Sequence, residues 1–138
     1  MSIEHFDAVI VGAGQAGPAI AARCSKEGLR TALIERGHFG GTCVNVGCVP
    51  TQTLVASARA IHQARRGAEF GFSAGEVRVE MARVMARKDA IVAQSRTGVQ
   101  EWMRGLKHTE VIVGDARFVA PATLEVAEAH VAGFMTGA

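Results

Sequence analysis

The feature of this sequence that most constrains its fold is a glycine pattern near the start of the chain. Gly12, Gly14 and Gly17 form G-x-G-x-x-G between two segments of different periodicity. The apolar run over residues 6–11 is too short for a helix and predicts a buried parallel strand, whereas the alanine-rich segment over 15–27 predicts a helix. Strand, glycine turn and helix in this order indicate an α/β fold that begins with a dinucleotide-binding turn.

Each glycine has a mechanical task in such a turn. The first permits the tight change of direction, the second lets a pyrophosphate approach the backbone, and the third lets the helix pack on the strand. The unpaired amides and the partial positive charge at the helix N-terminus then attract the phosphates. The context on both sides of the glycines therefore favours dinucleotide binding over a purely structural turn.

A carboxylate follows where such folds contact the ribose. Residues 31–35 predict a second strand, which completes a Rossmann-like β-α-β unit, and Glu35 ends it 18 residues after Gly17. We expect Glu35 to accept hydrogen bonds from the ribose hydroxyls. Its negative charge would repel the additional phosphate of NADP, so FAD and NAD remain as ligands of this turn.

The rest of the chain predicts two helices and a β-hairpin. Apolar spacing indicates a helix over 51–65, after a glycine-rich and cysteine-containing loop, and one long amphipathic helix over 80–106. Two β-rich runs flank Gly114-Asp115, a dipeptide typical of two-residue hairpin turns. Residues 123–126 predict a further strand.

Composition narrows the class of protein. With 138 residues the chain has the size of one domain with one core, and 49% apolar with 20% charged residues excludes a disordered chain. The net charge is +2 and no more than two basic residues are adjacent, which argues against nucleic-acid and anionic-membrane partners. Because the chain has neither a membrane-length apolar run nor a signal peptide, we expect a cytoplasmic protein.

Two of the three cysteines form a close pair. Cys43 and Cys48 are separated by four residues just ahead of the helix expected from about Pro50, a spacing that permits a disulfide. The helix N-terminus favours thiolate over thiol, so the pair suits redox chemistry. A reduced structural pair is the alternative, and zinc is disfavoured because no second ligand pair accompanies it, so we expect no metal site. Cys24 is interpreted as a small buried side chain of the first helix.

Three motifs together resemble a known family. VGAGQAG, ALIER and GGTCVNVGCVP are similar to the corresponding segments of the FAD-dependent pyridine nucleotide-disulfide oxidoreductases, which include glutathione reductase, dihydrolipoamide dehydrogenase and mercuric reductase. The resemblance is specific over residues 6–60 and looser to about residue 126. Within the family, CVNVGCVP is most similar to the mercuric and glutathione reductase branches.

The resemblance implies a mechanism and a set of site residues. A nicotinamide, NAD(P)H, reduces FAD, and electrons then pass to a redox-active Cys43–Cys48 disulfide and on to a small-molecule disulfide or a thiol-bound metal ion. Cys48 would lie nearest the flavin and Cys43 would attack the substrate. The ADP half of FAD would be held by Gly12, Gly14, Gly17 and Glu35, with Gly41 and Thr42 along the cofactor.

This sequence departs from the family in two respects. Gln52 stands where the family has a lysine that tunes the flavin, so we expect altered flavin reactivity at this position. The family's chains are several times longer, so residues 1–138 are interpreted as the N-terminal part of an FAD-binding domain, an incomplete domain without the nicotinamide and dimerisation domains. We expect negligible turnover from this chain alone and a homodimer for the complete enzyme. The closing TGA, residues 136–138, is weakly similar to the strand that continues such a domain.

Two other functions stay open from the residues alone. The chain could be part of an NAD-binding dehydrogenase, in which Glu35 holds NAD and the cysteines are incidental. It could also be a non-catalytic redox-sensing module, in which the helix over 80–106 docks a partner and the cysteine pair is a switch.

Overall fold

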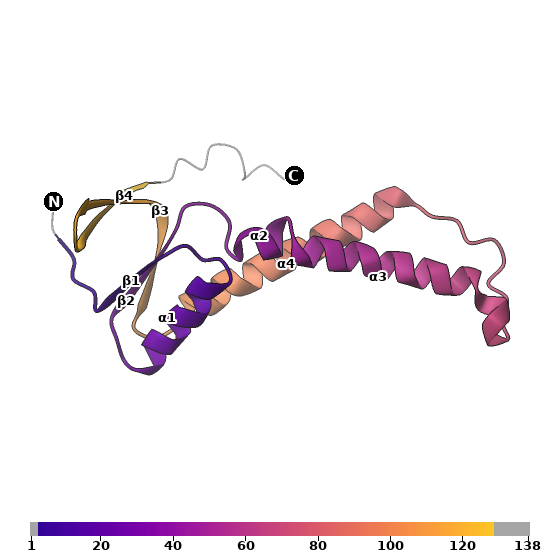
Figure 1. Cartoon of the computed structure of the whole chain (residues 1–138), viewed down its shortest axis with the longest axis horizontal. Helices are drawn as coiled ribbons and strands as arrows, with labels where there is room; N and C mark the ends of the chain where they lie inside the picture. Colours follow the sequence, from indigo (N-terminus) through magenta and orange to yellow (C-terminus); the bar gives the residue numbers. More distant parts are fainter. Residues whose placement is uncertain (1–2, 129–138) are drawn as a thin grey trace. The chain divides into compact units, whose positions relative to one another are not determined.

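A computed structural model describes residues 3–128 of the chain. These residues divide into two compact units, one made of residues up to 41 together with those from 96 onward, and the other of residues 42–95. Figure 1 shows the elements in chain order, coloured along the sequence. They are β1 (Ala8–Val11), α1 (Ala16–Lys26), β2 (Thr31–Glu35), α2 (Gly41–Asn45), α3 (Cys48–Arg65), the 3-10 turn η1 (Gly67–Phe70), α4 (Met81–Arg104), β3 (Thr109–Ala120) and β4 (Thr123–Glu128).

The first unit is built on a four-stranded sheet in the order β1-β2-β3-β4. β1 and β2 pair in parallel through Ala8↔Thr31, and β2 pairs in parallel with the first half of β3 through Thr31↔Thr109. The second half of β3 pairs antiparallel with β4. The expected β-α-β unit is confirmed, with α1 ending at Lys26 just before Gly28, which adopts a φ of +77°.

The core of the first unit lies under α1 and the last part of α4. Leu33 and Met103 are fully buried, and Ala13, Ala21 and Phe39 complete the cluster. Ile10 of β1 and Val111 of β3 pack against this cluster, so helices cover this face of the parallel sheet. Chain length predicts one domain with one core, whereas the structure divides into this unit and a second compact unit of residues 42–95.

The opposite face of the same sheet is hollowed within the described residues 3–128. A cavity of about 960 Å³ is lined by apolar side chains of β1, β2 and β3, by residues 3–6 and by the β3–β4 hairpin, and its polar lining residues include Glu4, His5 and Glu125. Val11 and Phe118 on this face are 57% and 73% exposed. An apolar sheet face of this extent is unusual on the surface of a folded unit.

The second unit consists of helices. It contains α2 from Thr42 onward, α3, η1 and the first part of α4, with Val44, Thr53 and Val92 as buried side chains. Arg87 of α4 donates to the Thr53 carbonyl oxygen and to the Ser57 hydroxyl of α3, which joins the two helices. Across residues 3–128, every helix is too short or too polar to span a bilayer.

The structure differs from the sequence predictions around the cysteine pair and in the hairpin, and it agrees with them on the long helix. The helix predicted from about residue 51 begins at Cys48, and the position of Pro50 in its first turn is confirmed. The loop before this helix contains the short helix α2. The long helix is confirmed as Met81–Arg104. The hairpin turn predicted at Gly114-Asp115 is wrong, because β3 runs through these residues and the chain turns at residues 121–122.

A close approach of β4 explains the glycine in β3. A Cβ on Gly114 would lie 2.6 Å from the Ala127 carbonyl oxygen, so the missing side chain serves strand packing instead of a turn. The strand predicted over 123–126 is confirmed as Thr123–Glu128. The similarity noted for the closing TGA lies outside the described residues.

Candidate cofactor and redox site

The glycine turn has the geometry that its pattern predicts. Gly12 adopts a φ of +100°, which an L side chain rarely tolerates, so the chain reverses direction there at little steric cost. A Cβ on Gly17 would overlap the carbonyl oxygen of Gly12, so only glycine lets α1 approach the end of β1 so closely. A Cβ on Gly14 would meet nothing within 4 Å, which leaves this side of the turn open.

Gln15, the residue before α1, does not cap this helix with its side chain. Gln15 precedes the helix in a helical conformation without a capping hydrogen bond, and the first turn contains no acidic residue. The Gln15 side-chain amide donates instead to the Gly40 carbonyl oxygen at 3.3 Å. Neither the N-cap residue nor an acidic residue of the first turn therefore occupies the first amides of α1, which suits an anion-binding helix end.

Glu35 is hydrogen-bonded to the backbone of the turn. Its Oε2 accepts from the Ala13 amide at 2.6 Å, and its Oε1 accepts from the Gly37 amide at 2.7 Å. Each carboxylate oxygen has a second lone pair, so Glu35 can still accept hydrogen bonds from hydroxyl groups. Sequence reasoning placed this carboxylate at the end of β2 but missed its bonds to the loop.

The segment after β2 closes on the glycine turn. The Gly40 amide donates to the Ala13 carbonyl oxygen at 2.7 Å. Gly41 adopts a φ of +57°, and a Cβ there would lie 2.9 Å from the Cα of Gly14. The first unit thus brings Gly12, Gly14, Gly17, Glu35 and Gly41 together around one turn.

The second unit brings the cysteines together. Cys43 of α2 and Cys48 at the start of α3 form a disulfide, with Cα atoms 4.6 Å apart. The turn between them depends on Gly47, where a Cβ would lie 3.0 Å from the Thr42 carbonyl oxygen. Cys48 is exposed and Cys43 is half-buried. Cys24, predicted to be buried, is free and half-buried in α1.

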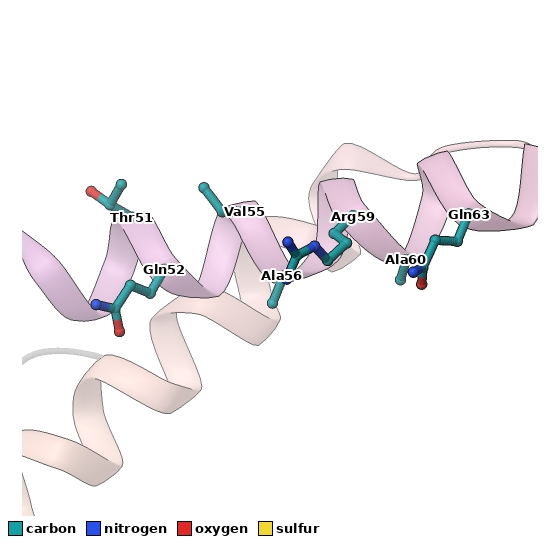
Figure 2. A pocket seen from close by; sticks show the side chains of 7 residues that line it. All are labelled: Thr51, Gln52, Val55, Ala56, Arg59, Ala60 and Gln63. Carbon is teal, nitrogen blue, oxygen red and sulfur yellow. The ribbon is translucent and has the colours of Figure 1, made fainter.

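The exposed face of α3 carries Gln52. A shallow hollow of about 430 Å³ runs along this face and is lined by seven residues of α3 alone, Thr51, Gln52, Val55, Ala56, Arg59, Ala60 and Gln63 (Figure 2). Arg59 is the only charged side chain in this lining. Both Thr42 and Gln52 are exposed within the second unit.

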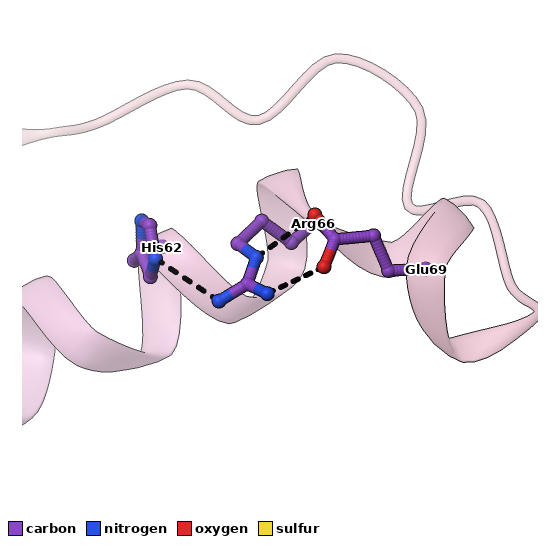
Figure 3. Close-up of polar contacts among 3 residues, drawn as sticks. All are labelled: His62, Arg66 and Glu69. Atoms are coloured by element: carbon purple, nitrogen blue, oxygen red, sulfur yellow. Dashed lines mark hydrogen bonds and ion pairs between the residues drawn. The ribbon is translucent and has the colours of Figure 1, made fainter.

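A polar cluster terminates α3. Arg66 donates to both carboxylate oxygens of Glu69, and its Nη1 lies 3.5 Å from His62 Nε2 (Figure 3). The hydrogen bond from Arg66 lowers the pKa of Glu69, and the same bond raises the pKa of Arg66. All three residues are exposed, so this cluster is a solvated helix end.

Three comparisons with known proteins agree. Residues 6–132 match the family model for pyridine nucleotide-disulphide oxidoreductases. The dihydrolipoyl dehydrogenase of Mycoplasma pneumoniae is 35% identical over 124 residues, which are 89% of this chain and 27% of that protein. The mercuric reductase of Lysinibacillus sphaericus is 34% identical over 125 residues, 89% of this chain and 22% of that protein. The chain therefore spans about a quarter of the length of these curated relatives.

The fold also has a solved counterpart. The Cu(II) complex of RclA, an HOCl-induced flavoprotein disulfide reductase from Escherichia coli, superposes with a TM-score of 0.71 at 31% identity, over 91% of this chain and 25% of that one. At this identity and score the likeness extends beyond the isolated β-α-β unit to most of the chain.

Proposed function

This chain belongs to the pyridine nucleotide-disulphide oxidoreductase family, and on that premise we propose that it is the FAD-binding and redox-disulfide portion of an FAD-dependent disulfide oxidoreductase. Members of the family are flavoproteins that use FAD and NAD(P)H. The observation that carries the proposal is the Cys43–Cys48 disulfide at the start of α3, in a chain that also contains the glycine turn. In the NAD-binding dehydrogenase alternative, the two cysteines would be incidental.

The residues around the glycine turn fit the ADP half of FAD. The open side of Gly14, the uncapped first turn of α1 and the remaining lone pairs of Glu35 offer a backbone cradle, amide donors and hydroxyl acceptors. We propose that Gly12, Gly14, Gly17 and Glu35 hold this half, with Gly41, Thr42 and Gln52 along the rest of the cofactor. When bound, FAD supplies an acceptor for hydride from NAD(P)H and a two-electron donor for the disulfide.

The two cysteines would divide the substrate half of the reaction. In the reduced pair, the Cys43 thiolate attacks one sulfur of a substrate disulfide, forms a mixed disulfide and releases one thiol. Cys48 then attacks the Cys43 sulfur, which closes the Cys43–Cys48 disulfide and releases the second thiol. Each turnover thus returns the pair to the oxidised state and reduces one substrate disulfide. Cys48 is exposed and Cys43 is half-buried, and the reactivity of each thiol distinguishes their roles.

Thiol reactivity of the full chain tests the redox pair. On a Cys24→Ser background, the wild-type pair should show no free thiol before treatment with dithiothreitol and two afterwards. Cys43→Ser and Cys48→Ser should each leave one free thiol. The variant that retains Cys43 should attack glutathione disulfide faster, forming a mixed disulfide and releasing one glutathione. Two free thiols under oxidising conditions would contradict the proposed pair, and faster reaction of Cys48 would reverse the assigned roles.

Nucleotide binding by the full chain tests the other half. Flavin fluorescence quenching should report FAD binding, and Glu35→Gln should weaken it by about tenfold, since a lost hydrogen bond to a charged group is worth about 1.5 kcal/mol. Glu101→Gln is the matched control, because this exposed residue lies on α4 outside the glycine turn. Binding of NAD in preference to FAD would support the dehydrogenase alternative instead.

The finer assignments are part of the proposal. A small-molecule disulfide or a thiol-bound metal ion is the substrate class that the family suggests, and a homodimer is the assembly we expect of the complete enzyme. We propose the cytoplasm as the compartment, because disulfides in that reducing compartment are usually transient and catalytic or redox-sensing.

A further inference from the structure

Arg87 of α4 contacts the helix that begins at the redox pair. Its Nη1 lies 3.1 Å from the Thr53 carbonyl oxygen and 3.2 Å from the Ser57 hydroxyl oxygen, so one nitrogen serves two acceptors one turn apart on α3. Arg83, one turn earlier on α4, pairs instead with Glu80 of its own segment. Arg87 therefore joins α4 to α3 through residues that lie 30 positions apart in the sequence.

Hydrogen bonds continue from this contact to the first turn of α3. The Thr53 hydroxyl donates to the Val49 carbonyl oxygen at 2.8 Å, and Thr53 is 7% exposed, which makes this a well-protected bond. Val49 follows Cys48 directly. Two residues earlier, the Thr51 amide donates to the Gly47 carbonyl oxygen at 3.1 Å. Arg87 thus binds Thr53, and Thr53 binds the residue that directly follows Cys48.

The contact between Arg87 and α3 has its largest effect when the Cys43–Cys48 pair is reduced. When the disulfide is reduced, the side-chain bond between Cys43 and Cys48 is gone and only the main chain at residues 46–47 joins α2 to α3 covalently. The distance between the two sulfurs then depends on this short connection and on the non-covalent contacts of each helix. A thiol held near its partner has a higher effective concentration, which favours the disulfide. A bond that restrains the first turns of α3 therefore acts on the thiol–disulfide equilibrium.

We propose that Arg87 is a positioning residue that sets the reduction potential of the Cys43–Cys48 pair by restraining the start of α3. This inference rests on the proposed redox role of the pair. Arg87 touches neither sulfur in the contacts described above, and it acts through Thr53 and Ser57 of α3.

The test is a redox titration of the full chain, without added flavin, on a Cys24→Ser background. In buffers of reduced and oxidised dithiothreitol, the reagent gives two electrons and two protons to the Cys43–Cys48 bond and closes its own disulfide. Acid quenching, maleimide labelling and mass spectrometry then count the thiols. Arg87→Gln should lower the equilibrium constant for forming the protein disulfide by about three- to tenfold, which raises the midpoint by about 14–30 mV.

Matched variants separate positioning from general stability. Arg83→Gln removes an exposed arginine of the same helix and should leave the midpoint unchanged. Ser57→Ala, a mild change that removes one acceptor, should shift the midpoint in the same direction by a smaller amount, and Arg87→Lys should restore part of the shift. Thermal unfolding of each reduced variant shows whether the midpoint follows global stability.

The outcomes are distinguishable. If the wild-type pair titrates reversibly but Arg87→Gln and Ser57→Ala keep its midpoint, the role of Arg87 is refuted and the redox pair stands. An equal shift in Arg83→Gln, or a shift that tracks the unfolding temperature across all variants, would also refute it. If the wild-type cysteines never form a reversible disulfide, both the proposed function and this role fail.

Discussion

Replacing Gly17 by alanine tests whether the third glycine of the pattern is required by packing. The added Cβ would overlap the carbonyl oxygen of Gly12, which belongs to the backbone and has no rotamer to change. We compare it with Gly98→Ala, because Gly98 lies inside α4 in the same compact unit and a Cβ there would meet nothing within 4 Å. The two substitutions are chemically identical and differ in the space around them.

The two substitutions should change the free energy of unfolding in opposite directions. Alanine stabilises an exposed helix interior by about 0.5–1 kcal/mol relative to glycine, so Gly98→Ala should raise the free energy of unfolding by about that amount. Overpacking costs about 1–3 kcal/mol, which exceeds the same propensity gain at position 17. Gly17→Ala should therefore be net destabilising, by about 0.5–2 kcal/mol.

Urea unfolding followed by circular dichroism measures the difference. With a slope of about 2 kcal/mol/M, the two variants should have midpoints about 0.5–1.5 M apart, with the wild type between them. If Gly17→Ala gained as much stability as Gly98→Ala, the close approach of α1 to the end of β1 would have no energetic consequence and the reasoning would be refuted.

Three further substitutions probe other contacts. Leu33→Ala should lower the free energy of unfolding by about 2–5 kcal/mol, because Leu33 is fully buried, and a loss below 1 kcal/mol in urea unfolding would mean that the core collapses around the gap. Arg30→Ala should release the N-terminal segment, because Arg30 bonds the His5 carbonyl oxygen at 2.6 Å and stacks 4.4 Å from the Phe6 ring centre; faster hydrogen exchange of the β1 amides would show it, and unchanged exchange would contradict it. Glu69→Gln removes a carboxyl whose pKa is lowered from 4.5 mainly by the hydrogen bond from Arg66. The advantage of the wild type over Glu69→Gln should be present above pH 4.5 and disappear as the pH falls through the lowered pKa, and a difference that is constant in thermal unfolding from pH 7 to pH 3 would exclude this linkage.

Local sequence signals were sufficient for the N-terminal part of the fold. The bounds of β2 match the prediction over 31–35, and α1 ends next to Gly28 as predicted, because strand length, helix period and a glycine stop are all local properties. The mechanical tasks of Gly12 and Gly17 are confirmed for the same reason, since each depends on residues within one turn of the chain.

A residue type with two uses produced the main error. Glycine before aspartate is typical of a hairpin turn, but Gly114 is glycine because β4 approaches its backbone, and that neighbour is set by pairing across the hairpin. The true turn, at residues 121–122, carries a weaker signal. A pattern that reports missing side-chain volume does not say whether the volume is needed for a turn or for a neighbour.

Side-chain partners of the site could not be predicted either. Glu35 was assigned to a ligand, and its bonds to the Ala13 and Gly37 amides depend on how the loop folds back. Arg87 is one of many basic residues on helical segments, and nothing in its local sequence distinguishes it from Arg83. Which arginine joins two helices is decided by their packing, which spacing alone does not encode.

The hollow apolar face of the first unit has a practical consequence for work with this polypeptide. Val11 and Phe118 keep more than half of their surface in contact with solvent, and apolar surface becomes more costly to hydrate as a solution is warmed from the cold. Concentrated samples should scatter more light on mild warming while their circular dichroism is unchanged, and sulfate should intensify this clustering. Dilute, cool, low-salt handling is the regime in which the equilibrium measurements above report on single molecules.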